Sequence, residues 1–132
     1  MIESARQFVA LRTSDRPEDY LRAANDSAET EVWLEVLRDF PEMKSWVAHN
    51  KSVPVEILDI LAKDQNPEVR HSVAMKNKLS MQSMMMLASD SDESVRERIV
   101  YNKNAGEVVL QKLANDPVGR IASVARERLA GG

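Results

Sequence analysis

Three basic side chains recur at one spacing, and they are the first residues of this chain that could do chemistry. Lys44, Arg70 and Arg96 lie 26 residues apart, each after a hydrophobic residue. Evenly spaced cations could follow a phosphate backbone. Asp64 and Asp90, however, precede Arg70 and Arg96 by six residues, across a predicted turn. We therefore expect each arginine to bridge the loop carboxylates of its own and the adjacent repeat, because bidentate arginine–carboxylate pairs suit stacked helices.

The two histidines do not form a metal-binding pattern. His49 and His71 lie 22 residues apart and differ in their position relative to the 26-residue spacing. A zinc site needs further converging ligands, and no His-x-x-x-His pair is present. The chain contains no cysteine, which excludes disulfides, thiolate zinc sites, cysteine-ligated iron–sulfur clusters and a cysteine nucleophile. We expect no metal and no cofactor.

Catalytic motifs are also missing from the sequence. It contains no Gly-x-Ser-x-Gly elbow and no glycine-rich phosphate loop. Its carboxylates are numerous, but they are spread over predicted helix surfaces. We expect a protein that is not an enzyme and has no catalytic residue.

Two other groups of side chains have competing interpretations. Asn50 and Asn102 end predicted helices before a turn, where an Asn side chain ties the loop more often than it binds a ligand. One predicted helix contains four methionines, of which Met84 takes a core position and Met85 an outward one. Met85 could contact a protein partner, because methionine adapts to many surfaces, or it could be buried against a neighbouring repeat. The sequence leaves both interpretations of Met85 open.

The elements that must position these residues repeat every 26 residues. The phrase Leu-Ala-x-Asp occurs at 61–64, 87–90 and 113–116, and a second phrase starts at 43, 69 and 95. Each repeat contains one helical pattern with apolar residues at i, i+3 and i+4, and one with i, i+4 pairs. Polar residues before proline, at Asn66-Pro67 and Asp116-Pro117, predict helix starts. No alternating strand pattern is present, so the predicted fold class is all-α.

Residues 47–64, followed by Pro-Glu-Val-Arg-His-Ser-Val-Ala at 67–74, resemble the leucine-rich repeat variant, a relative of HEAT and armadillo repeats. The resemblance covers residues 31–129, with Lys51 and Lys103 in positions where the family often has proline. It implies a right-handed α-solenoid of HEAT-like helix pairs, used mainly for binding. The cysteine-bound iron–sulfur cluster that family members can pair with a similar repeat does not carry over.

We therefore expect three regions in the chain. Residues 1–30 form N-terminal capping helices, at Ser4–Arg12 and Pro17–Ala24, because a terminal repeat would otherwise expose its apolar face. Residues 31–129 form four helical repeats, and residues 130–132 form a tail.

Composition narrows the classes of partner. The 132 residues have a net charge of −3, and the excess acid lies in residues 1–53. This balance provides no general attraction to nucleic acid or to anionic lipid. No apolar stretch is long enough to span a membrane, and the first residues do not form a signal peptide. We expect a cytoplasmic protein that is a monomer or a weak dimer.

The outward positions of the second helices vary while the core positions are constant, as in a binding scaffold. The leading hypothesis is a protein-binding module, such as a regulator or an immunity-type inhibitor of its partner. The alternative is a nucleic-acid binding or repair protein of the HEAT-like alkylpurine DNA glycosylase type, which would require a continuous basic strip on the concave face. The candidate partner-binding residues on that face are His49, His71, Met75, Met85, Arg98 and Tyr101.

Overall fold

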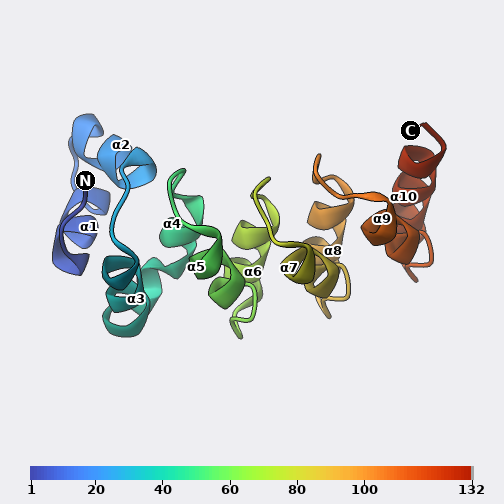
Figure 1. Cartoon of the computed structure of the whole chain (residues 1–132), viewed down its shortest axis with the longest axis horizontal. Coiled ribbons are helices and arrows are strands. Elements are labelled where there is room, and N and C mark those ends of the chain that lie inside the picture. Colours follow the sequence, from blue (N-terminus) through green and yellow to red (C-terminus); the bar gives the residue numbers. More distant parts are fainter. Residues whose placement is uncertain (132) are drawn as a thin grey trace. The chain divides into compact units, whose positions relative to one another are not determined.

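The computed structural model describes residues 1–131, which form ten α-helices, one short 3₁₀ helix and no strand (Figure 1). The one sheet-like contact in this range is an isolated bridge between Ile2 and Ala28. The chain divides into two compact units, Met1–Leu61 and Ala62–Gly132. No helix within residues 1–131 has the length and apolar character needed to cross a membrane.

The N-terminal unit contains five α-helices and the 3₁₀ helix η1. In chain order they are α1 (Ala5–Arg12), α2 (Pro17–Asn25), α3 (Thr30–Asp39), η1 (Pro41–Met43), α4 (Lys44–His49) and α5 (Val55–Leu61). Helices α1 and α2 lie where N-terminal helices were expected, at Ser4–Arg12 and Pro17–Ala24, and their capping role stays a prediction. Ser4 caps the first, because its side chain accepts a hydrogen bond from the Gln7 N–H.

The core of the N-terminal unit lies between α1 and α3, which pack against each other. Phe8 and Trp33 are fully buried there and meet edge to face, with ring centroids 5.3 Å apart and an interplanar angle of 78°. This arrangement places the positive edge of one ring against the negative face of the other. Helix α1 also contacts α2, and α3 also contacts α4, so this core supports the three helices that line the pocket described below, α1, α2 and α4.

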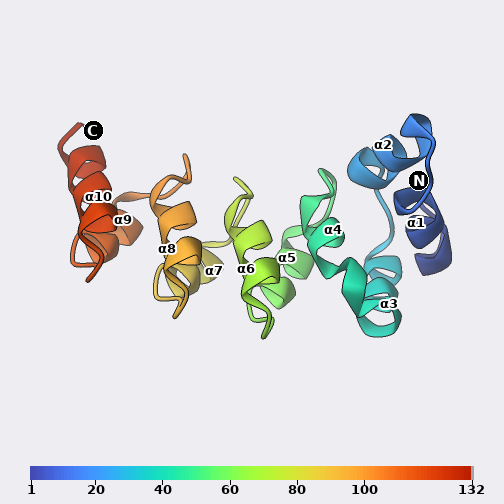
Figure 2. The same cartoon turned by 180° about the vertical axis from the view of Figure 1, so that it is seen from behind.

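The C-terminal unit contains the other five α-helices. They are α6 (Pro67–Ala74), α7 (Met81–Leu87), α8 (Glu93–Val100), α9 (Glu107–Leu113) and α10 (Gly119–Gly131). In this unit α8 packs against α6 on one side and α10 on the other (Figure 2). Three apolar side chains at equivalent positions of α6, α8 and α10 are fully or almost fully buried: Val69, Val95 and Ile121.

The 26-residue spacing of the sequence recurs in the helix starts. Helices α5, α7 and α9 begin at residues 55, 81 and 107, and α6, α8 and α10 begin at 67, 93 and 119. The 3₁₀ helix η1 begins at 41, one period before α6. The predicted alternation of two helices per 26 residues is therefore confirmed.

Two local predictions differ from the structure. Pro117 was expected at the first position of a helix, but α10 begins two residues later, at Gly119. The physical reason is that Asp116 does not cap the helix; its carboxylate accepts the Val118 N–H in the loop and also binds an arginine. At the other end of α10, Ala130 and Gly131 continue the helix where a tail was expected, and Gly132 lies outside the described residues.

Candidate functional site

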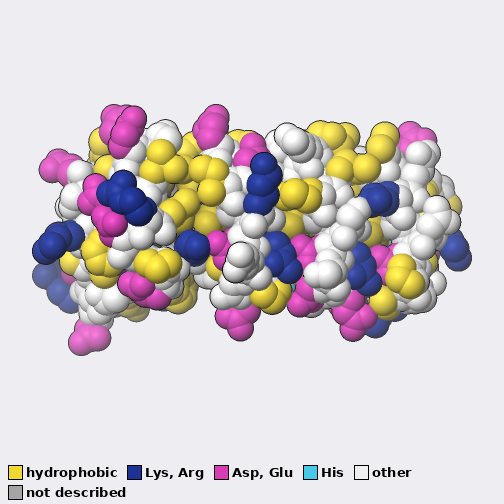
Figure 3. Space-filling view, turned by 90° about the horizontal axis from the view of Figure 1, so that it is seen from below, with side chains coloured by type: hydrophobic (Ala, Val, Ile, Leu, Met, Phe, Trp, Pro, Cys, Tyr) yellow, Lys and Arg dark blue, Asp and Glu magenta, His cyan; other side chains and the backbone are white. Residues whose placement is uncertain are grey.

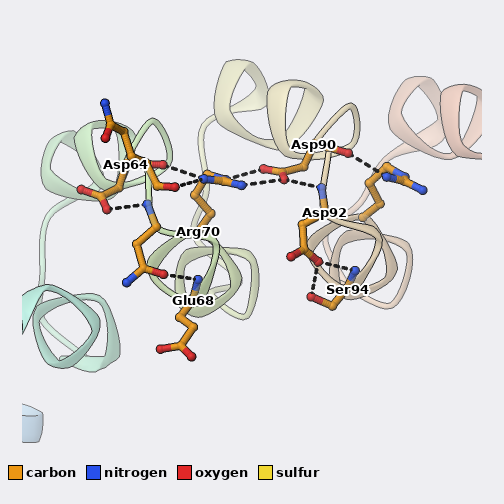
Figure 4. Close-up of polar contacts among 9 residues, drawn as sticks. Asp64, Glu68, Arg70, Asp90, Asp92 and Ser94 are labelled. Atoms are coloured by element: carbon orange, nitrogen blue, oxygen red, sulfur yellow. Dashed lines mark hydrogen bonds and ion pairs between the residues drawn. The ribbon is translucent and has the colours of Figure 1, made fainter.

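Arg70, in the middle of α6, connects its own loop to the loop between α7 and α8 (Figure 4). Its Nε and Nη2 atoms donate to the two carboxylate oxygens of Asp90, at 2.7 and 3.0 Å. Its Nη1 atom donates to the carbonyl oxygens of Asp64 and Gln65, at 2.8 and 3.0 Å. The hydrogen bond to Asp90 raises the pKa of Arg70. All three nitrogen atoms of this guanidinium therefore donate hydrogen bonds to protein oxygens.

Arg96 on α8 repeats the arrangement one period later. Its Nε atom donates to the Asp116 carboxylate at 2.8 Å, and its Nη1 atom donates to the Asp90 carbonyl oxygen at 2.8 Å. The Asp90 and Asp116 side chains are only 7% and 3% exposed. Asp90 therefore binds Arg70 through its carboxylate and Arg96 through its backbone.

The expected arginine–carboxylate pairing is confirmed for the adjacent repeat and wrong for each arginine's own repeat. Each arginine instead binds the backbone carbonyl oxygen of the aspartate six residues before it, Asp64 or Asp90. This short separation along the chain brings the guanidinium against the loop backbone. The carboxylates of Asp64 and Asp90 instead accept the N–H groups of Asn66 and Asp92, at 3.0 and 2.9 Å, and so shape their turns.

Asn50 ties the loop after α2 to the loop after α4 within the N-terminal unit. Its buried amide donates to the carbonyl oxygens of Ala23 and Asp26, at 2.8 and 2.9 Å. Its Oδ1 atom accepts the Ser52 N–H at 2.7 Å. The predicted structural role of Asn50 is confirmed.

Asn102 has the same role in the C-terminal unit. Its amide donates to the carbonyl oxygens of Ala74 and Lys76, at 3.2 and 2.8 Å, and its Oδ1 atom accepts the Asn104 N–H at 2.9 Å. Arg128 is the next member of this series and was not predicted from the sequence. Its Nη1 atom donates to the carbonyl oxygens of Val100 and Asn102, both at 2.8 Å. The 26-residue period indicates this role for Arg128, because Arg128 follows Asn102 by one period.

The predicted partner-binding residues are spread over both units. Met75 and Tyr101 are 44% and 56% exposed and immediately follow α6 and α8, at equivalent positions of two helices that pack together. Arg98 is exposed on α8, His71 is half-buried on α6, and Met85 is half-buried on α7. His49 belongs to the N-terminal unit, so the C-terminal unit contains the other five candidates.

Charged side chains on the outward positions of α8 and α10 pair with each other. Arg120 donates from Nε to Glu97 at 2.9 Å, and its Nη2 atom lies 3.6 Å from a carboxylate oxygen of Glu93. The hydrogen bond to Glu97 raises the pKa of Arg120. On the face of the C-terminal unit drawn in Figure 3, basic side chains lie beside acidic ones without forming an unbroken basic strip.

The N-terminal unit carries a pocket of about 180 Å³, and His49 is the one lining residue that was predicted from the sequence. It is lined by Arg12, Tyr20, Leu21, Ala23, Ala24, Trp46 and His49. Trp46 is 42% exposed, and its ring centroid lies 5.8 Å from that of His49. The Cζ atom of Arg12 lies 3.3 Å from the centroid of the Trp46 ring. The sequence contains a weak sign that position 46 is special. The equivalent positions of the next two repeats are Ser72 and Arg98, and neither residue is aromatic.

Comparison with known proteins gave no match, whether to a family model, to a curated protein or to a solved structure. The resemblance to the leucine-rich repeat variant thus stays a prediction. Residues 1–131 contain no group of three or more His, Cys, Asp or Glu side chains that could hold a metal ion.

Proposed function

We propose that this chain is a non-enzymatic scaffold that binds a protein partner through the concave face of a right-handed α-solenoid of HEAT-like pairs. As a small binding module it would act as a regulator or an immunity-type inhibitor of that partner. The all-helical fold, the 26-residue step of the helix starts and the contacts between successive helices support the solenoid. A cytoplasmic location is part of the proposal, because a chain without cysteine suits a reducing compartment.

The observation that carries this proposal is the exposure of Met75 and Tyr101 at equivalent positions of neighbouring helices. Large apolar and aromatic side chains that stay exposed on an ordered surface are typical of protein-binding surfaces, where Tyr and Met are enriched. Val73 and Ile99, each two residues before the exposed side chain, are fully buried.

The repeating cations favour a protein partner over a nucleic acid. Arg70 and Arg96 are bound to Asp90 and Asp116, and Arg120 is bound to Glu97. An arginine in an ion pair contributes little to phosphate binding, because it must first give up its carboxylate before it can replace a counterion. The net charge of −3 also disfavours binding to nucleic acid.

Affinity capture from a nuclease-treated native lysate tests the proposal. The bait is the full chain, compared with a Met75→Ala/Tyr101→Ala variant and with Val108→Ala as a matched control. Val108 is 54% exposed on α9, so its truncation removes an exposed apolar side chain at a different place. We expect a protein that the wild type and Val108→Ala both retain and the double variant loses.

Two outcomes contradict the proposal. Retention that is seen in an untreated lysate and is absent from the nuclease-treated one would point to nucleic acid as the partner and support the HEAT-like glycosylase alternative. Retention that is unchanged in the double variant would move the binding surface away from Met75 and Tyr101.

A further inference from the structure

We infer that the Trp46 pocket, lined by Arg12, Tyr20, Leu21, Ala23, Ala24, Trp46 and His49, binds a peptide segment of a partner protein. The segment has one bulky apolar side chain next to a single carboxylate. The inference rests on the proposed protein-binding function and adds to it a second site, in the N-terminal unit, with a defined partner chemistry.

The size of the Trp46 pocket sets what can enter it. Its volume of about 180 Å³ is below the range of roughly 300–1,000 Å³ that is usual for small-molecule sites. Its lining includes Leu21, which is 55% exposed, and Tyr20, which is 40% exposed. A pocket of this size and lining suits one apolar side chain, inserted between exposed aromatic and aliphatic groups.

Arg12 supplies the contact for the carboxylate. Its Cζ atom lies 3.3 Å from the Trp46 centroid, and the guanidinium nitrogens lie about 1.3 Å from Cζ, as in other conjugated C–N bonds. A guanidinium standing upright on the ring would push a nitrogen into the indole, so the two groups must be stacked nearly flat. In a stacked guanidinium the N–H donors point outward around its edge, where two of them can bind a carboxylate in a bidentate pair.

The charge of Arg12 is not neutralised by an acidic side chain in the part of the chain that the structure describes. The neighbouring arginines differ, since Arg16 pairs with Glu18 at 2.6 Å and Arg22 pairs with Asp26 at 2.9 Å. Arg12 instead has its cation–π contact with Trp46. One cation over one small apolar pocket is complementary to one carboxylate beside one apolar side chain.

The charge of the surrounding unit argues against a polyanion at this site. Residues 1–61 contain 7 Lys and Arg and 12 Asp and Glu, a net charge of −5. A nucleic acid could also stack a base on Trp46, but its row of phosphates would meet this negative field. A peptide with a single carboxylate avoids most of that repulsion.

Nuclear magnetic resonance of the full ¹⁵N-labelled chain tests the inference through its two tryptophans. The indole N–H signal of Trp46 reports the pocket, and that of the fully buried Trp33 is an internal reference in the same unit. The probes are short synthetic Gly/Ser peptides containing Phe next to Asp, Phe next to Asn, or Ala next to Asp, and a thymidine oligonucleotide. Trp46→Phe assigns the two signals.

We expect the Phe–Asp peptide to shift the Trp46 signal in a saturable way and to leave the Trp33 signal in place. Replacing Asp by Asn in the peptide, or Arg12 by Gln in the protein, should weaken binding about tenfold or more, because a hydrogen bond to a charged group is lost. Arg38→Gln is the matched control, since Arg38 is exposed and pairs with the adjacent Asp39. Leu21→Ala is a second test at an exposed position and should weaken binding of the Phe–Asp peptide while Trp33 reports an intact fold.

The inference is overturned if the Phe–Asp peptide does not shift the Trp46 signal, or if the Phe–Asn peptide binds equally well. A stronger shift with the oligonucleotide than with the Phe–Asp peptide would also overturn it and would favour nucleic acid. These results are separable from the capture experiment, which examines Met75 and Tyr101 in the other unit. A retained partner without peptide binding contradicts only the pocket, and peptide binding without a retained partner contradicts only the Met75 and Tyr101 surface.

Discussion

Asp90 and Asp116 are carboxylates that have exchanged most of their water for protein donors. Each accepts an arginine in the same geometry and also accepts a backbone N–H two residues later. Removing charges from water costs free energy that such contacts only partly offset, so these pairs do not by themselves make the fold stable. Removing one partner has a larger effect, because it leaves the other charge buried without compensation.

Arg96→Ala should therefore destabilise the C-terminal unit strongly. The Asp116 carboxylate, 3% exposed, would lose its cation, and breaking a buried pair in this way costs on the order of 3–5 kcal/mol. Chemical denaturation monitored by circular dichroism measures the change. Arg38→Ala, which breaks a solvent-exposed pair with Asp39, is the comparison and should leave the midpoint nearly unchanged. Equal midpoints for the two variants would show that the Arg96–Asp116 pair lies in water.

Asp92 provides a test by pH at the same scale. Hydrogen bonds from the Ser94 side chain and backbone hold the pKa of Asp92 below its usual value. A lowered pKa in the folded state means that the ionised cap contributes stability above the unfolded pKa of about 3.9, and that this contribution disappears as the pH falls through the lower folded value.

Asp92→Asn keeps an oxygen that can accept the Ser94 N–H but cannot titrate. The difference in melting temperature between the wild type and Asp92→Asn should be constant above about pH 5 and should shift against the wild type as the pH falls below the unfolded pKa of about 3.9. Thermal melts over a pH series measure it. A difference independent of pH down to the onset of acid unfolding would contradict the role of the ionised cap.

At the scale of elements, the loops are held by side chains placed one period apart. Asn102 closes the loop after α6, and Arg128 closes the loop after α8. Each of them donates to two carbonyl oxygens at or just beyond the C-terminus of a helix, groups that have no partner inside the helix itself. The short helices of the C-terminal unit therefore depend on contacts from the following repeat for their ends.

Asn102→Ala should cost about 1–3 kcal/mol, since it leaves the carbonyl oxygens of Ala74 and Lys76 without their donor. Asn102→Asp should be worse than Asn102→Ala at neutral pH, because a carboxylate would face two carbonyl oxygens. Asn104→Ala is the matched control, because the Asn104 side chain makes one exposed hydrogen bond, to the Asn77 carbonyl oxygen. Denaturation midpoints rank the variants, and an Asp variant as stable as the wild type would rule out the donor role.

At the scale of the whole molecule, the charge distribution does not favour a polyanion as the partner. The net charge is −3, and among the described residues six arginines are in ion pairs with carboxylates: Arg16, Arg22, Arg38, Arg70, Arg96 and Arg120. The surface of the C-terminal unit drawn in Figure 3 alternates in sign. Such a surface selects partners by shape and local contacts more than by a general field.

Affinity for DNA or RNA should therefore be weak and independent of sequence. Fluorescence anisotropy with duplex and single-stranded DNA at about 0.15 M salt should give no dissociation constant tighter than the non-specific range of roughly 10⁻⁴ to 10⁻⁶ M. A dissociation constant below that range, with a steep dependence on salt, would mean that the paired arginines become available to phosphates. It would favour the nucleic-acid hypothesis.

The sequence alone determined where the helices lie, because the 26-residue period records local requirements: apolar residues such as Leu61, Leu87 and Leu113 on one helix face, and Asn50 and Asn102 at turns. It also indicated that Arg70 and Arg96 bind loop groups. Only the tertiary structure decided which atoms they bind, since the choice between an aspartate's carbonyl and its carboxylate depends on how adjacent loops meet. The tertiary structure also decided the Trp46 pocket. Arg12, Tyr20 and Trp46 belong to three helices, and no spacing along the chain encodes the packing that brings them together.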